Sequence, residues 1–210
     1  MALGVASAGG SAGQLIMALV GGALIDSMGW AAALLVMAII AAFIIPLALG
    51  VRGKSAGDGG PAQSLREALR EASGNKNYWL LCAGFFVCGF HVAFIATHLP
   101  PYLADNDMQT MLAATAIAII GFFNILGTLA SGWLGGKYRQ NYVLSIYYLM
   151  RAVVIAGFLI FPVTQTSVLT FAALMGFLWL GAVPLTSGLV AQIFGARYLG
   201  ALFGIVFFSH

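Results

Sequence analysis

Charged side chains are scarce in this sequence. Asp, Glu, Lys and Arg make up 7% of its 210 residues, whereas 61% of the residues are hydrophobic. An ordinary soluble domain carries roughly a quarter charged residues. So little polar material cannot coat a globule of this size, and most of the exterior must therefore face hydrocarbon. A water-soluble globular protein is excluded.

Clusters of basic residues are also missing, although nine Lys and Arg outnumber six Asp and Glu. A protein that binds nucleic acid gathers its basic residues on one polar face. Here they are scattered between long apolar runs, so we expect no nucleic-acid partner. The first basic residue is Arg52, and the apolar residues 1–25 therefore lack the charged start of a signal peptide.

Patterns for catalysis and metal binding are absent as well. The sequence contains no HExxH motif and no phosphate-cradling loop. Cys82 and Cys88 lie in one apolar run, where we interpret both as small apolar side chains. His91 and His98, two helical turns apart, are too distant to share an ion and have no third ligand nearby. We expect neither an enzyme nor a bound metal or cofactor.

Long apolar stretches are what the sequence holds instead. Each is close to the length of about 20 residues that a helix needs to cross roughly 30 Å of hydrocarbon. They run approximately over residues 4–25, 30–50, 78–98, 111–134, 142–161 and 167–194, and another begins near residue 198. The sequence predicts an all-α transmembrane bundle of six full spans plus the start of a seventh. We expect the chain to be truncated at its C-terminus.

Basic residues lie in every second connection between these spans, and therefore on one side of the membrane. The connections at residues 51–77, 135–141 and 195–197 hold eight of the nine Lys and Arg, while the other three connections hold none. Two spans separate successive basic connections, so the parity agrees throughout. By the positive-inside rule the basic side is cytoplasmic. We predict a multi-pass protein of the plasma membrane, the inner membrane in a bacterium, with loop 51–77 in the cytoplasm.

The connection at residues 51–77 contains a short amphipathic pattern. Ser64 followed by Glu67 is typical of a capping box at a helix N-terminus. One face of the following turns is apolar and the rest is charged, which predicts a short helix along the cytoplasmic surface. A solvated linker helix and a regulatory or lipid-binding helix are both compatible with this pattern.

Two features inside the spans fit either packing or a solute cavity. Pro184 interrupts the unusually long sixth span, and broken helices often border transport sites. A kink that only fits its neighbours is an equal alternative. Small residues, which let helix backbones approach closely, recur in the fourth span as Gly121, Gly127, Gly132, Gly135 and Gly136.

Three short motifs carry a resemblance to a known family, through their order along the chain and the side of the membrane on which each is predicted to lie. They are Gly29-Trp30 before the second span, residues 132–139 (GWLGGKYR), and residues 195–200 (GARYLG). The sequence resembles the major facilitator superfamily, in particular its bacterial monocarboxylate-transporter-like and oxalate/formate-antiporter-like members. Residues 132–139 resemble the second copy of the gating-loop motif of that family, which implies gating roles for Gly132, Gly135, Lys137 and Arg139. Gly136 replaces the acidic residue of the motif, which puts a charge relay there in doubt.

The resemblance also implies a domain order. Residues 1–50 would be the last two helices of the N-terminal half, residues 51–77 the cytoplasmic linker, and residues 78–210 helices seven to ten with the start of eleven. Helices one to four and the end of the bundle would be missing. The implied mechanism is alternating access, in which two helical bundles rock about a site near the middle of the membrane. The full-length protein would be a monomer in the lipid bilayer.

Arg151 is the basic residue that lies well inside a span. A charge in the membrane costs several kcal/mol unless it is paired or faces water, so it is a candidate functional group. Its guanidinium could clamp a carboxylate through two parallel hydrogen bonds. Asn124 lies at a similar depth on the preceding span, and the alternative is that the two side chains satisfy each other. The resemblance places Arg151 on a peripheral helix, which favours this alternative.

Other candidates for solute binding or coupling are His91, His98 and Trp179. Histidine titrates near neutrality, which suits proton coupling. Hydrogen-bonded packing is the alternative for His91, and a helix-end role for His98. We expect a secondary active transporter of a small solute, of the organic, monocarboxylate-like anion class, with a co-transported proton left open. The competing hypothesis is a permease subunit or another polytopic membrane protein without transport activity of its own.

Overall fold

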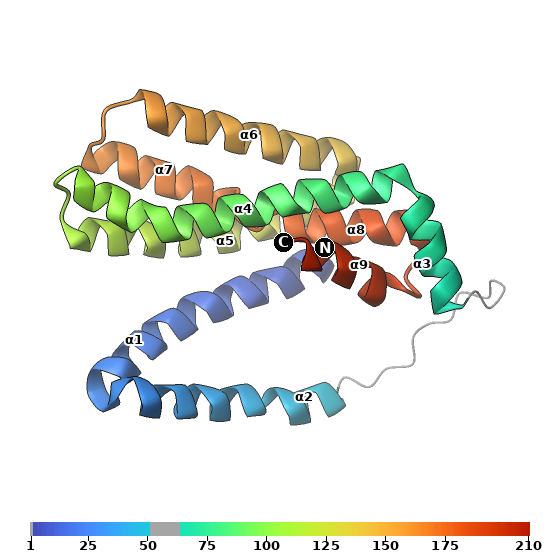
Figure 1. Ribbon diagram of the computed structural model, residues 1–210, viewed down its shortest axis with the longest axis horizontal. Coiled ribbons are helices and arrows are strands. Elements are labelled where there is room, and N and C mark those ends of the chain that lie inside the picture. The colour runs from blue at the N-terminus through green and yellow to red at the C-terminus, as the bar shows by residue number, and fades with distance from the viewer. Residues whose placement is uncertain (1, 51–63) are drawn as a thin grey trace. The chain divides into compact units, whose positions relative to one another are not determined.

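The computed structural model describes residues 2–50 and 64–210, and these residues form helices joined by short turns (Figure 1). The first part of the predicted linker, residues 51–63, lies outside the described residues. The helices are α1 (Ala2–Ala42), α2 (Ile44–Gly50), α3 (Leu65–Gly74), α4 (Lys76–Asp105), α5 (Thr110–Lys137), α6 (Gln140–Ile160), α7 (Gln165–Phe177), α8 (Ala182–Phe194) and α9 (Leu199–Phe208).

Five segments of the described chain are long and apolar enough to cross a membrane. They are Ser27–Gly50, Lys76–Asp105, Met111–Lys137, Gln140–Ile160 and Gln165–Phe194. They correspond to the predicted second to sixth spans. The predicted first span lies within α1, and the shorter apolar helix α9 begins where the seventh is predicted. The predicted all-α transmembrane class is confirmed, and the chain is an integral, multi-pass membrane protein.

The chain divides into two compact units, Gly13–Pro61 and the combination of Met1–Ala12 with Ala62–His210. In the smaller unit, α1 bends at Gly29, whose φ of 78° lies in the region that favours glycine. The first two predicted spans are therefore joined at a single residue instead of a loop. Gly21 on one arm lies against Met37 on the other, since a Cβ at Gly21 would meet its sulfur at 3.5 Å. The predicted three-part domain division stays a prediction.

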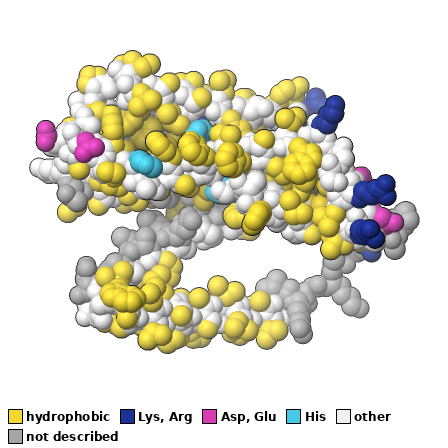
Figure 2. Space-filling model, viewed as in Figure 1, with side chains coloured by type: hydrophobic (Ala, Val, Ile, Leu, Met, Phe, Trp, Pro, Cys, Tyr) yellow, Lys and Arg dark blue, Asp and Glu magenta, His cyan; other side chains and the backbone are white. Residues whose placement is uncertain are grey.

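Three clusters of buried side chains hold the larger unit together. One joins α4, α5 and α7 around Leu103 and Met175, a second joins α3, α4, α8 and α9 around Phe85, and a third joins α4, α6 and α8 around Leu185. Lys and Arg side chains gather at the end of this unit where α3 meets α4 (Figure 2). The basic residues of the predicted cytoplasmic connections lie at helix ends and turns as far as the structure describes them. Arg66 and Arg70 belong to α3, Lys76 begins α4, and Lys137 ends α5, while Arg139 and Arg197 lie in the turns before α6 and α9.

Helix α4 continues through Pro100 and Pro101 to Asp105, so the predicted end of the third span at His98 is wrong. Proline lacks an N–H and usually interrupts a helix. Here Leu99 and Leu103, which are 5% and 1% exposed, bury the same face of α4 on both sides of the prolines. This packing outweighs the loss of two backbone hydrogen bonds.

The capping box predicted at Ser64 and Glu67 is confirmed. The Ser64 N–H donates to Glu67 Oε2 at 2.7 Å, and the Glu67 N–H donates to Ser64 Oγ at 3.3 Å. The Ser64 N–H and, at 3.0 Å, the Ser64 hydroxyl both donate to Glu67 Oε2, which favours the carboxylate and holds the pKa of Glu67 below its ordinary value. Ala68 and Ala72 are buried on the inner face of α3, as the amphipathic pattern predicts.

Candidate functional site

The span Gln165–Phe194 is broken at its centre. Helices α7 and α8, of 13 residues each, are separated by the non-helical residues 178–181. Pro184 is the third residue of α8, where a helix needs no N–H donor within itself. The proline therefore allows α8 to start and prevents the helical ladder from continuing back across the break. The interruption predicted at Pro184 is present, and it begins at Leu178.

Arg151 on α6 binds the carbonyls that lack helical hydrogen-bond donors at this break. Its Nε donates to the Leu178 carbonyl at 2.8 Å, and its Nη2 donates to the carbonyls of Leu178, at 2.5 Å, and Trp179. The side chain is fully buried, at 0% exposed. A broken helix leaves carbonyls without donors, and an unpaired carbonyl in hydrocarbon is costly. The guanidinium supplies those donors in a planar fork.

Asn124 on α5 binds the same break through its amide oxygen. The Leu180 N–H donates to Asn124 Oδ1 at 3.0 Å, and Thr128 Oγ1 donates to the Asn124 carbonyl at 2.7 Å. Asn124 is 3% exposed. Among the described residues, no hydrogen bond joins Asn124 to Arg151. The two side chains thus satisfy one break from two helices, one accepting and one donating, instead of satisfying each other.

Glycines let the neighbouring helices reach the break. A Cβ at Gly127 of α5 would lie 1.7 Å from the Phe177 carbonyl oxygen, and one at Gly181 would lie 2.3 Å from Cε1 of Tyr147. The Tyr147 hydroxyl donates to the Gly127 carbonyl at 3.2 Å. Any larger side chain at Gly127 would push the end of α7 away from α5. The backbone position of the break therefore depends on this glycine.

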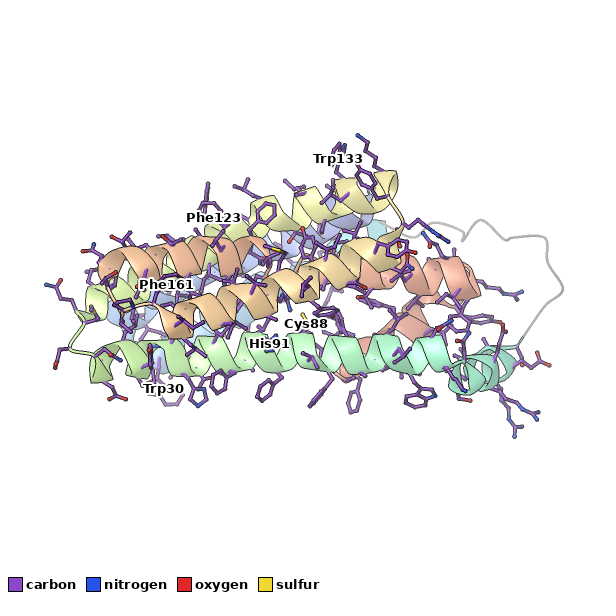
Figure 3. All side chains as sticks on the ribbon, turned by 90° about the horizontal axis from the view of Figure 1, so that it is seen from above. Trp30, Cys88, His91, Phe123, Trp133 and Phe161 are labelled. Atoms are coloured by element: carbon purple, nitrogen blue, oxygen red, sulfur yellow. The ribbon has the colours of Figure 1, made fainter. Side chains whose placement is uncertain are left out.

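The opposite side of the guanidinium faces α4. Arg151 Nη1 donates to Cys88 Sγ at 3.1 Å, and its Cζ lies 5.7 Å from the ring centroid of Tyr148. Figure 3 shows Cys88 between α4 and α6 and His91 further along α4. His91 Nδ1 and the Tyr148 hydroxyl are buried without a hydrogen-bond partner among the described residues. Unpaired polar atoms thus lie on the facing sides of α4 and α6.

Two other candidates take different positions. His98 is exposed, its Nδ1 lies 2.9 Å from the Phe94 carbonyl oxygen, and its ring stacks on Phe94 at a centroid distance of 4.4 Å. It belongs to the far part of α4, away from the break. Trp179 is 8% exposed and packs in the cluster of α4, α5 and α7. Its backbone carbonyl, and not its indole, is the group that binds Arg151.

Residues 132–139, the predicted gating loop, cover the last turns of α5, which ends at Lys137, and the short turn that leads to α6. A Cβ at Gly132 would lie 2.7 Å from the Cα of Gly4, and one at Gly135 would lie 2.7 Å from Cδ2 of Leu185. Both glycines thus permit close helix contacts. Lys137 lies over the ring of Trp133 at 5.1 Å, and Arg139 lies over the ring of Tyr142 at 5.6 Å. These contacts hold both cations at the end of the bundle.

Comparison with known proteins identifies the family. The model of the Major Facilitator Superfamily matches residues 1–210. The chain belongs to the major facilitator superfamily. The superfamily membership that the motifs predict is confirmed, and the similar proteins are named as transporters.

Several superfamily members align with this chain. The uncharacterized MFS-type transporter YcxA of Bacillus subtilis is 27% identical, with 100% of this chain and 53% of the relative covered. Monocarboxylate transporter 12 of Mus musculus is 26% identical, with 100% and 50% covered. The uncharacterized MFS-type transporter YhjX of Escherichia coli is 26% identical over 66% of this chain and 35% of the relative. The chain thus spans about half the length of the first two relatives.

In this superfamily member, sequence reasoning missed part of the site. Cys88, interpreted as an apolar filler, accepts from Arg151, and Tyr148 lies beside the guanidinium. A Tyr three residues before an intramembrane Arg is on the same helical face, which is a signal that the sequence contains. The backbone carbonyls of the break carry no such signal, because only the fold shows which carbonyls lose their helical donors.

Proposed function

We propose that this chain forms part of a secondary active carrier that moves a small organic anion of the monocarboxylate kind by alternating access. The observation that carries the proposal is a fully buried guanidinium at a helix break in the middle of a span. Of the acidic residues whose side chains the structure describes, Glu67 and Glu71 belong to α3, Asp105 ends α4 and Asp107 follows it, so these four lie at the ends of spans. Among the described residues, the guanidinium of Arg151 donates to the carbonyls of Leu178 and Trp179 and to Cys88 Sγ, and not to a carboxylate, which leaves a positive potential inside the bundle.

An anion is the solute that this potential favours. In a low-dielectric interior, a positive charge attracts an anion more strongly than in water, and it repels a cation. The guanidinium donors are occupied by the carbonyls of Leu178 and Trp179 in this arrangement. We therefore assign Arg151 a positioning role, in which it holds the break and contributes its field. His91, with an unpaired ring nitrogen nearby, is the candidate for proton coupling.

The break also suits alternating access. Two half-helices joined by four non-helical residues can tilt separately, because no continuous ladder of hydrogen bonds joins them. Arg151 and Asn124 keep the break satisfied from α6 and α5. The proposal includes a plasma-membrane location with the basic end in the cytoplasm and a monomeric full-length protein.

Uptake into proteoliposomes tests this function. The full-length protein should accumulate at least one labelled mono- or dicarboxylate and no organic cation of similar size. The Arg151→Gln variant should insert into the membrane but lose uptake, while Arg70→Gln on the exposed face of α3 should transport normally. Uptake of cations in place of anions would contradict the proposal. A lack of uptake of any solute by the wild type would favour the alternative of a membrane protein without transport activity of its own.

A further inference from the structure

A second feature of the larger unit is a groove of about 900 Å³ between α4 and α6, lined also by α8. Its mouth lies at the turn between α5 and α6, where Lys137 and Arg139 line it. Polar side chains, among them Asn77, Asn141 and Gln192, line the groove together with leucines, among them Leu80, Leu144 and Leu189. The groove therefore combines a cationic mouth with walls that are partly polar and partly apolar.

The mouth carries two positive charges that no acidic side chain among the described residues contacts. Lys137 and Arg139 are exposed, and their described contacts are with aromatic rings. The acidic pair Asp105 and Asp107 lies at the opposite end of α4. An anionic group is the ligand that this mouth fits.

The inside of the groove has the length of a lipid chain in one leaflet. The groove extends from the mouth inward to Gly84 and Tyr148. A Cβ at Gly84 would lie 3.5 Å from the Tyr148 ring, so these two residues narrow its inner end. From Arg139 to Tyr148, α6 rises about 13 Å at 1.5 Å per residue. Half of a hydrocarbon core is about 15 Å thick.

We propose that this groove binds one anionic phospholipid, with its phosphate at Lys137 and Arg139 and one acyl chain along the leucines. The inference rests on the proposed orientation, because anionic lipids concentrate in the cytoplasmic leaflet. It does not depend on which solute the protein carries. The leucines of the groove favour a lipid over free phosphate, since a small anion would leave them uncovered.

Native mass spectrometry of the full-length protein in detergent tests the proposal. Phosphatidylglycerol should remain bound when phosphatidylcholine with the same acyl chains dissociates. The double variant Lys137→Gln/Arg139→Gln should weaken phosphatidylglycerol binding by roughly thirtyfold. The matched control Arg66→Gln/Arg70→Gln removes the same charge from α3, outside the groove, and should bind as the wild type does. Equal weakening in both double variants, or in neither, would overturn the proposal.

Two further measurements separate lipid from free anion and do not need the double variants to fold. Millimolar glycerol 3-phosphate or inorganic phosphate should leave the lipid bound, and displacement by either would indicate a site for small anions. The fluorescence of Trp133 is the part of the signal that is lost in the Trp133→Phe variant. Brominated phosphatidylglycerol should quench this fluorescence more strongly than brominated phosphatidylcholine does. Equal quenching by the two lipids would overturn the lipid assignment.

Discussion

Replacing Arg151 by Met tests how the broken span is held. Met has a similar length and no donor, so the carbonyls of Leu178 and Trp179 would lose their partners. A buried carbonyl left unpaired costs about 1–3 kcal/mol. Interhelical hydrogen bonds in membranes measure lower, at about 0.6 kcal/mol on average. Removing a buried charge also recovers part of its desolvation cost. We therefore expect the free energy of unfolding to fall by about 2–3 kcal/mol, which is the lower part of the range obtained by adding the costs of the two carbonyls.

Unfolding in mixed detergent micelles, followed by circular dichroism, measures this change. Arg151→Lys should lower the free energy of unfolding by about half as much. Its ammonium can donate to one carbonyl but cannot donate to two carbonyls in a planar fork as the guanidinium does. The control Arg70→Met on the exposed face of α3 should stay within about 0.5 kcal/mol of the wild type. If Arg151→Met unfolds like the wild type, the guanidinium does not hold the break. If a variant that unfolds like the wild type nevertheless loses binding of the solute, Arg151 acts on the solute itself and not by holding the break.

Three smaller changes test neighbouring parts. Asn124→Leu should destabilise by about 1–2 kcal/mol in the same assay, and Asn124→Asp by less, because an acceptor remains. Gly127→Ala should reduce the yield of folded protein sharply, since its Cβ would lie 1.7 Å from a carbonyl oxygen, whereas Gly136→Ala meets open space. Glu67 stabilises α3 above the ordinary carboxyl pKa of about 4.3, and this contribution is lost as pH falls through its lowered pKa. Ser64→Ala should raise that pKa toward the ordinary value in a carbon-13 NMR titration.

The sequence predicts the bundle well because a membrane restricts the possible folds. Spans follow from apolar length, which is a property of local composition. The membrane sides assigned from the basic residues stay a prediction. The capping box at Ser64 is equally local, and the structure contains it. Helix α4 extends beyond the predicted span, because the packing of Leu103 that supports the extension comes from α5 and α7 and is not a local property of the sequence.

The candidate site was only partly predictable. The cost of an intramembrane charge singles out Arg151, and similar depth singles out Asn124. Their shared partner is a set of backbone groups between α7 and α8, which Pro184 indicates but does not locate. Which side chain meets which carbonyl depends on helix rotation and on close approach at Gly127. Those are properties of the packed bundle.

Reporter fusions at two positions test the threading through the membrane most directly. Green fluorescent protein placed after Gly50 should fluoresce, because the proposed topology puts that end in the cytoplasm. Alkaline phosphatase placed after Phe161 should be active, because the proposed topology puts that position on the opposite side of the membrane. Reporters that place Gly50 and Phe161 in the same compartment would contradict the topology on which the proposed carrier depends.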